Sequence, residues 1–151
     1  MSIRMLTIAV LLAVTAPVAL AGGRGTPIIP IENQPLGTTT LATAEQAIRL
    51  GAARREWIPE VVSPELVRCR LINRGHCVVV DVPHTADSFS IRYVDSSAMD
   101  YNAAAGTIHR KYNQWTANLA KDIQTASFAI GPAAAPARSQ GRASAFFAGN
   151  S

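Results

Sequence analysis

The order of apolar and polar residues divides the chain into a central region with clear periodicity and two ends without it. At the start of the central region, apolar residues recur every three or four positions, which is the spacing of one helix face. This series is Leu41, Ala44, Ile48 and Ala52, followed by Arg55. Thr43 can cap the helix, with Gln46 three residues later as in a capping box, and Pro59 cannot continue it. We therefore predict a helix that starts at Thr43 and ends before Trp57.

Four segments with two-residue alternation follow and are typical of half-buried strands. They are residues 57–62, 66–72, 76–83 and 88–94. Pro59 places the first segment at a sheet edge, because proline has no N–H to donate to a neighbouring strand. Asn73, Arg74 and Gly75 connect the second and third segments in a hairpin. Short links between consecutive strands imply an antiparallel meander.

A second amphipathic helix is expected at residues 108–126. Its apolar stripe consists of Ile108, Tyr112, Trp115, Leu119 and Ile123. A polar loop, residues 95–107, precedes it and contains Met99 and Tyr101 as expected anchors. The order helix, four strands, helix predicts an α+β domain of residues 41–126, in which both helices cover one face of a four-stranded antiparallel meander.

The two ends of the chain differ from this domain in composition. Residues 1–21 contain a basic residue, an apolar run and the motif Ala19-Leu20-Ala21, which together are typical of a cleaved signal peptide. The apolar run is shorter than the roughly 20 residues that a membrane span needs. Residues 22–40 are expected to form an extended N-terminal arm. Residues 127–151, rich in Ala, Pro, Ser and Gly, are expected to form a flexible tail.

The signal sequence and the charge narrow the class of partner. Cleavage near Ala21-Gly22 predicts a periplasmic or secreted protein with no transmembrane segment in the mature chain. The sequence of 151 residues has a net charge of +4, to which Arg4 of the signal contributes one. Because the basic residues are not clustered, no nucleic-acid partner is expected. The expected partner is an envelope protein or a glycan, and no cofactor is expected, since glycine-rich phosphate loops are absent.

The two cysteines allow two interpretations. An oxidising compartment favours a disulfide between Cys69 and Cys77. The alternation of the hairpin favours free thiols, because Cys69 falls among core-facing positions and Cys77 among outer ones, and opposite faces cannot be bridged without moving the backbone. A two-residue turn at Asn73-Arg74 pairs Cys69 with Val78. A bulge at Gly75 would shift the register and allow the bond.

Several short motifs resemble those of a family of small, uncharacterised bacterial envelope proteins, many of them lipoproteins. The motifs are Arg55-Glu56-Trp57, Arg74-Gly75-His76, Phe89-Ser90-Ile91-Arg92-Tyr93 with Asp95-Ser96, and Ile108-His109 with Tyr112-Asn113-x-Trp115 and Leu119. The family usually has a glycine where this chain has Glu56. Many members carry a lipobox cysteine where this chain has Gly22, so we expect a soluble product. The resemblance implies the fold and the envelope location, and it implies no particular activity.

Two groups of residues are candidate binding surfaces. The first gathers where the last strand, the polar loop and the second helix are expected to meet: Tyr93, Tyr101, His109, Tyr112, Asn113 and Trp115. It would form a shallow pocket for a polar ligand such as a glycan or peptide, although large aromatics at helical spacing are usually core residues. The second group is a basic outer face of Arg68, Arg70 and Arg92. These arginines would bind an anion or a partner, or keep the sheet soluble and pair with Asp81.

Catalysis is the alternative class of function. Of the three histidines, His76 and His84 lie at opposite ends of one strand, roughly 26 Å apart by strand rise, so no metal site is expected. No nucleophile-elbow motif is present. The enzyme hypothesis is a small periplasmic hydrolase that uses His109 with the loop carboxylates Asp95 and Asp100. The sequence favours a binding or structural accessory module over this hydrolase.

Overall fold

The computed structural model describes residues 25–131. The predicted signal peptide and residues 132–151 of the predicted tail lie outside the described residues. The elements in chain order are β1 (Thr26–Pro27), β2 (Ile31–Pro35), α1 (Leu41–Ala53), β3 (Ile58–Ser63), β4 (Leu66–Asn73), β5 (His76–Pro83), β6 (Ser88–Ser97), β7 (Thr107–Ile108) and α2 (Lys111–Ile130).

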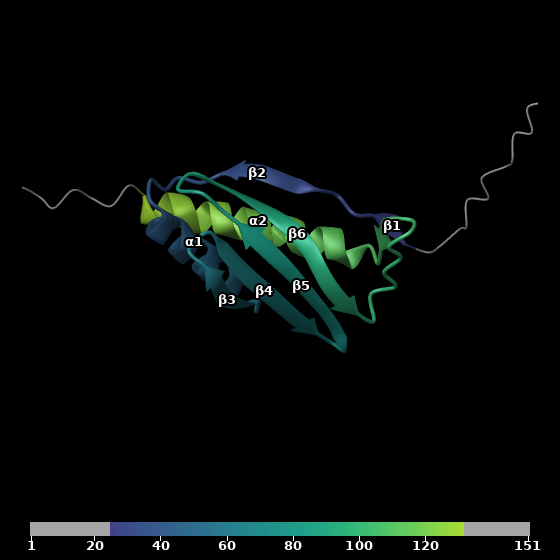
Figure 1. Ribbon diagram of the computed structural model, residues 1–151. Helices are drawn as coiled ribbons and strands as arrows, with labels where there is room; N and C mark the ends of the chain where they lie inside the picture. The colour runs from purple at the N-terminus through teal and green to yellow at the C-terminus, as the bar shows by residue number, and fades with distance from the viewer. Residues whose placement is uncertain (1–24, 132–151) are drawn as a thin grey trace, which may run out of the picture.

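The α+β class is confirmed, and both helices lie on the same side of the sheet (Figure 1). The sheet is antiparallel and has five strands in the order β2-β6-β5-β4-β3, while β1 and β7 form a separate two-stranded sheet. The meander β3-β4-β5-β6 is therefore present, and β3 with Pro59 is an edge strand. The opposite face of the sheet carries no helix within the described part of the chain. We call it the outer face.

The expectation of four strands was wrong by one, because the N-terminal arm supplies β2 as a fifth. β2 pairs with β6 at Ile31↔Ile91 and Gln34↔Phe89, with a register shift between these pairs. Asn33 takes up the shift with a left-handed backbone, φ 50°. A short strand with an internal bulge has no strict alternation, so its sequence carries no strand periodicity.

The N-cap of helix α1 is Thr40, three residues earlier than the expected cap Thr43. The Thr40 hydroxyl accepts a hydrogen bond from the Thr43 N–H at 3.2 Å, and the Thr43 hydroxyl accepts one from the Thr40 N–H at 3.3 Å. Thr43 is therefore the second member of the capping box and not the cap. After the helix, Glu56 has φ 62°, in the left-handed region that favours glycine.

The β4–β5 hairpin turns at Arg74 and Gly75, both with positive φ (49° and 84°), as two-residue hairpin turns require. The expected turn at Asn73-Arg74 was wrong, and Cys69 pairs with Val80 instead of Val78. A register change of two residues leaves every side chain on its expected face. Both cysteines are free thiols, with Cys69 buried in the core and Cys77 half-buried on the other face.

The core lies between the sheet and the two helices. Its largest fully buried side chains include Tyr112, Phe89, Ile48, Met99, Ile108, Leu119 and Ile123. Helix α2 starts later than expected, at Lys111, because Ile108 belongs to β7, although Ile108 is still buried. The helix also runs four residues past the expected end, to Ile130. Residues 127–130, which were predicted to belong to the flexible tail, are therefore helical.

Candidate functional site

The predicted aromatic and amide group is divided by the structure into three separate sets of contacts. In the first, the Tyr93 ring contacts Tyr101 with centroids 4.2 Å apart and Tyr112 edge-on at 5.8 Å. Tyr112 is buried, and burial raises the pKa of its hydroxyl well above the usual range. This set joins the middle of β6 and the loop after it to the start of α2, so it fixes these segments together.

Asn113 forms the second set with the N-terminal arm. Its Nδ2 donates to the Pro27 carbonyl at 2.8 Å, and its Oδ1 accepts from the Ile29 N–H at 3.0 Å. The side-chain amide thereby forms the hydrogen bonds that a neighbouring strand would otherwise form with this stretch of the arm. These two bonds use both ends of the amide to hold the arm against α2.

His109 and Trp115 form the third set with His76. The two imidazole rings stack with centroids 5.9 Å apart, and Trp115 meets His76 edge-on at 6.3 Å. His76 Nδ1 donates to the Ala98 carbonyl at 2.6 Å. Residues 25–131 contain no group of three His, Cys, Asp or Glu side chains that could hold a metal ion.

The residues of the hydrolase hypothesis are each engaged locally. His109 Nδ1 accepts from the Lys111 N–H at 3.3 Å, and Asp95 Oδ1 accepts from the Ser96 N–H at 2.8 Å. Asp100 is exposed on a left-handed residue, φ 49°. None of these three acid and base candidates lines the cavities described below.

The predicted basic face has three arginines in three different environments. Arg68 donates to both carboxylate oxygens of Asp81, at 2.7 and 3.0 Å, and this pair raises the pKa of Arg68 above its ordinary value. Arg92 lies 3.8 Å from the Glu32 carboxylate, with 63% and 49% of the two side chains exposed, so solvent screens this contact. Arg70 is exposed. Of the three arginines, Arg92 is the one that lines the cavities described next, and its contact with Glu32 is weak.

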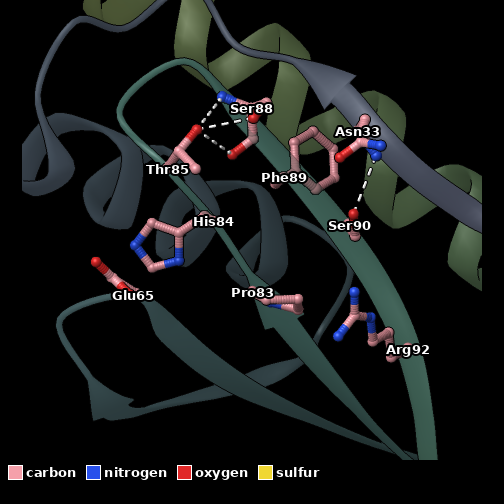
Figure 2. A pocket seen from close by; sticks show the side chains of 9 residues that line it. All are labelled: Asn33, Glu65, Pro83, His84, Thr85, Ser88, Phe89, Ser90 and Arg92. Carbon is pink, nitrogen blue, oxygen red and sulfur yellow. Dashed lines mark hydrogen bonds between the residues drawn. The ribbon is translucent and has the colours of Figure 1, made fainter.

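A pocket of about 200 Å³ lies where β5 and β6 separate. The two strands pair as far as Asp81↔Arg92 and meet again only at the bridge His84↔Phe89. Pro83, between these two points, has no N–H to donate to β6. The lining residues come from β2, the β3–β4 turn, β5, β6 and the turn after β5: Asn33, Glu65, Pro83, His84, Thr85, Ser88, Phe89, Ser90 and Arg92 (Figure 2).

His84 is the most unusual residue of this pocket. Its side chain is 5% exposed, and its Nε2 is the one buried side-chain nitrogen or oxygen within residues 25–131 that has no hydrogen-bond partner. Its Nδ1 lies 3.3 Å from the Val82 carbonyl, and its backbone N–H donates to the Glu65 carbonyl at 2.9 Å. A buried polar atom without a partner is rare and costly in folded proteins, and this one has less than 1 Å² of accessible surface.

A second cavity, of about 450 Å³, adjoins the first along the outer face. Both are lined by Glu65, Pro83 and Arg92, and the second also by Asp81 and Val94. We call the two adjoining cavities together the outer trough. Tyr93 is the one member of the predicted aromatic group that lines it.

Sequence reasoning placed Arg92 and Tyr93 on candidate binding surfaces and missed the other lining residues of the outer trough. The available signal was Pro83 followed by His84, which places a residue without an N–H and then a histidine at the end of a strand. In the hairpin pattern this looked like the ordinary end of a strand. Glu65 and Asn33 come from segments far away in the sequence, and no local pattern connects them to His84.

No protein-family model, curated protein or solved structure matches this chain. None of the helices in the described residues has the length and apolar character needed to cross a membrane.

Proposed function

We propose that the protein is an exported, noncatalytic binding module of the bacterial cell envelope that holds its ligand in the outer trough. The observation that carries this proposal is the pair of adjoining cavities where β5 and β6 separate, beside Arg92, whose contact with Glu32 is 3.8 Å long and solvent-exposed. Both helices pack on the opposite side of the sheet, so the outer trough is open to a ligand from solvent.

Export and envelope location are supported by the sequence of residues 1–21, with a basic residue, an apolar run and a small-x-small motif. Cleavage near Ala21-Gly22 gives a periplasmic or secreted chain without a lipobox cysteine. Intact mass spectrometry of the protein from periplasmic extract tests this directly. A mature N-terminus at Gly22 without added lipid mass is expected, and full-length protein in the cytoplasm would contradict it.

Binding is favoured over hydrolysis by what the candidate groups contact. In the outer trough, Arg92 is not committed to a strong internal bond. In the hydrolase hypothesis, the His109 Nδ1 lone pair is already occupied by the Lys111 N–H. A general base needs a free lone pair within hydrogen-bond distance of the proton it removes.

The proposal is tested by amide chemical shifts of ¹⁵N-labelled mature protein titrated with small-molecule extract of the periplasm. Shift changes should concentrate on the strands around Pro83 and Arg92 and disappear in Arg92→Glu. Arg70→Glu is the matched control, because Arg70 is exposed on β4 of the same sheet and lines neither cavity of the outer trough. An unchanged spectrum, or changes concentrated around His76 and His109, would refute binding in the outer trough.

A further inference from the structure

We propose that the free edge of β3 pairs with β3 of a second copy, so that two chains form one continuous antiparallel sheet of ten strands, five from each copy. All four helices then lie on one face of this sheet. The proposal concerns association and does not rest on a ligand in the outer trough. Three features of the described residues support it: the apolar side chains at this edge, a cavity between the edge and α1, and the charges along α1.

The two edge strands of the sheet, β2 and β3, differ in how they are protected against pairing with another chain. β2 follows Pro30, ends in Pro35 and is bulged at the left-handed residue Asn33, so it is interrupted along its whole length. Prolines and bulges are devices by which natural proteins prevent an edge from adding a strand. β3 has such devices only near its two ends, at Pro59 and at the register shift after Val61. The middle of β3 is therefore open to pairing.

The β3 edge is apolar as well as open. Ile58, Val61 and Val62 are exposed by 59%, 45% and 50%. Within residues 25–131, β3 pairs with β4 on one side and with no strand on the other. Exposed β-branched residues suit strand pairing, and an edge that combines them with unpaired backbone groups is a template for another chain. By contrast, β2 contains no exposed large apolar side chain.

A cavity of about 390 Å³ lies between this edge and α1, which contacts β3. Its lining residues are Gln46, Arg49, Leu50, Ala53 and Pro59. Side chains of a strand alternate between its two faces, so every second side chain of an added strand would point toward the helix side and contact Leu50. Strand addition of this kind combines backbone hydrogen bonds with pockets for alternate side chains. The cavity therefore suits a strand of another chain.

The charges of α1 favour a second copy as the source of this strand. Glu45 lies in the N-terminal half of α1, whereas Arg49 lies in its C-terminal half and Arg54 directly follows the helix. A twofold axis perpendicular to the sheet places the two β3 strands antiparallel, with the two α1 helices antiparallel beside them. The acidic half of each helix then faces the basic half of the other, so the surface is electrostatically complementary to itself. The contact between Arg49 and Glu45 within one chain is 3.5 Å long and partly exposed, and it leaves further donors of Arg49 for the copy.

Glu60 determines which register is favourable. When two identical strands pair antiparallel, one position lies on the axis, opposite its own copy. Glu60 at the axis would bring two carboxylates together, and directly opposed like charges are destabilising. Val61 at the axis brings two valines together instead. Val61 pairs with the buried Val67 of β4, so its side chain lies on the face that the helices cover. We therefore expect Val61 at the centre of the interface.

The first test is the mass of the mature protein in sedimentation equilibrium. At about 100 µM, twice the mass of a single chain is expected, because a dissociation constant in the micromolar range leaves mostly dimer at this concentration. Val61→Lys places a charge on the edge, opposite its own copy, and should weaken the dimer about tenfold or more. Ile72→Lys is the matched control, because Ile72 is an exposed β-branched residue of β4 away from this edge, and it should change the dissociation constant by no more than about twofold. Circular dichroism checks that both variants are folded.

Cross-linking locates the interface on β3. Opposed residues of an antiparallel pair have Cβ atoms about 4.5–5.5 Å apart, which is close to the separation that a disulfide needs. In a Cys77→Ser background, Val61→Cys should therefore form a disulfide-linked dimer when dissolved oxygen oxidises the two thiols. Ile72→Cys in the same background should remain a single chain under denaturing, non-reducing conditions. Cys69 is buried and is left unchanged in both variants.

A single-chain mass at every concentration, an unweakened dimer of Val61→Lys, or a dimer that Val61→Cys does not cross-link would overturn the proposal. Two other occupants of the edge would be detected by hydrogen exchange of the β3 amides in a monomer. Exchange that becomes faster when residues 132–151 are removed would assign the edge to that segment of the chain. Exchange that becomes slower in periplasmic extract would assign it to another protein. Both results contradict a second copy, and neither tests binding in the outer trough.

Discussion

Replacing Gly51 by alanine tests how closely the two helices approach each other. Gly51 is buried in α1, and a Cβ added there would lie 2.5 Å from both the Cα and the backbone nitrogen of Ile123 in α2. It would also lie 2.8 Å from the Ile123 Cγ1. Ordinary carbon contacts are about 3.5–4.0 Å, so the helices would have to separate by about 1 Å.

Two effects of Gly51→Ala oppose each other. Alanine has a better helix propensity than glycine by about 1 kcal/mol. Overpacking typically costs about 1–3 kcal/mol, and the upper end applies here because the obstructing atoms are backbone and cannot rotate away. We therefore expect a net loss of about 2 kcal/mol in the free energy of unfolding. For a domain of this size, that loss lowers Tm by about 10 °C.

Urea unfolding followed by far-UV circular dichroism measures this loss. Ala117→Gly is the matched control, because Ala117 is exposed on α2 and reports the difference in helix propensity without the contact. The control should lose about 1 kcal/mol. A Gly51→Ala protein that is as stable as the wild type, or more stable, would show that the helices do not approach this closely.

Three further predictions concern the arm, the left-handed residue and the core thiol. Asn113→Ala should lower the free energy of unfolding by about 1–2 kcal/mol, because two hydrogen bonds to the arm are lost. It should also speed amide hydrogen exchange in the arm. Unchanged exchange there would show that Asn113 does not hold the arm. Glu56→Gly should raise the free energy of unfolding by about 0.5–1 kcal/mol, because relief of left-handed strain exceeds the added chain entropy, and a lower Tm would contradict it. Burial raises the pKa of Cys69 from 9.0 to about 12, so the unfolded chain ionises first. The stabilising contribution of the neutral thiol is present below about pH 9 and is lost between pH 9 and pH 12, by about 1.4 kcal/mol per pH unit. As the pH is raised over this range, the Cys69→Ala variant should therefore lose less free energy of unfolding than the wild type. In the native protein, a thiol reagent should modify Cys77 before Cys69. Equal alkaline slopes, or faster modification of Cys69, would contradict its burial.

Alternation along the strands predicted the faces of the sheet well, because side chains follow a two-residue period wherever one face is buried. Val78, Val80 and Val82 lie inside, and Arg92 lies outside, as this period requires. The turn was displaced by one residue, yet the faces remained correct since the register changed by two.

Features that depend on distant residues could not be predicted in the same way. β2 pairs with β6 across more than half of the domain, and its bulge at Asn33 removes the periodicity that would have revealed it. The outer trough forms because β5 and β6 are not paired at Pro83. The absence of a strand pair produces no periodic pattern in the sequence. The spacing of Tyr112 and Trp115 correctly indicated a helix, but it did not indicate which neighbours these rings would contact.

The N-terminal arm has a consequence for how the chain folds. The Ile29 backbone bonds to a side chain 84 residues later, and the Asn33 backbone to one 57 residues later. Within the domain, the arm precedes β6 and α2 in the chain, so the arm has no partner until both of these elements are available. Such distant contacts slow folding, because a long loop must close before they form. The arm therefore cannot complete its hydrogen bonds before β6 and α2 are in place, although it is the first part of the domain in the sequence.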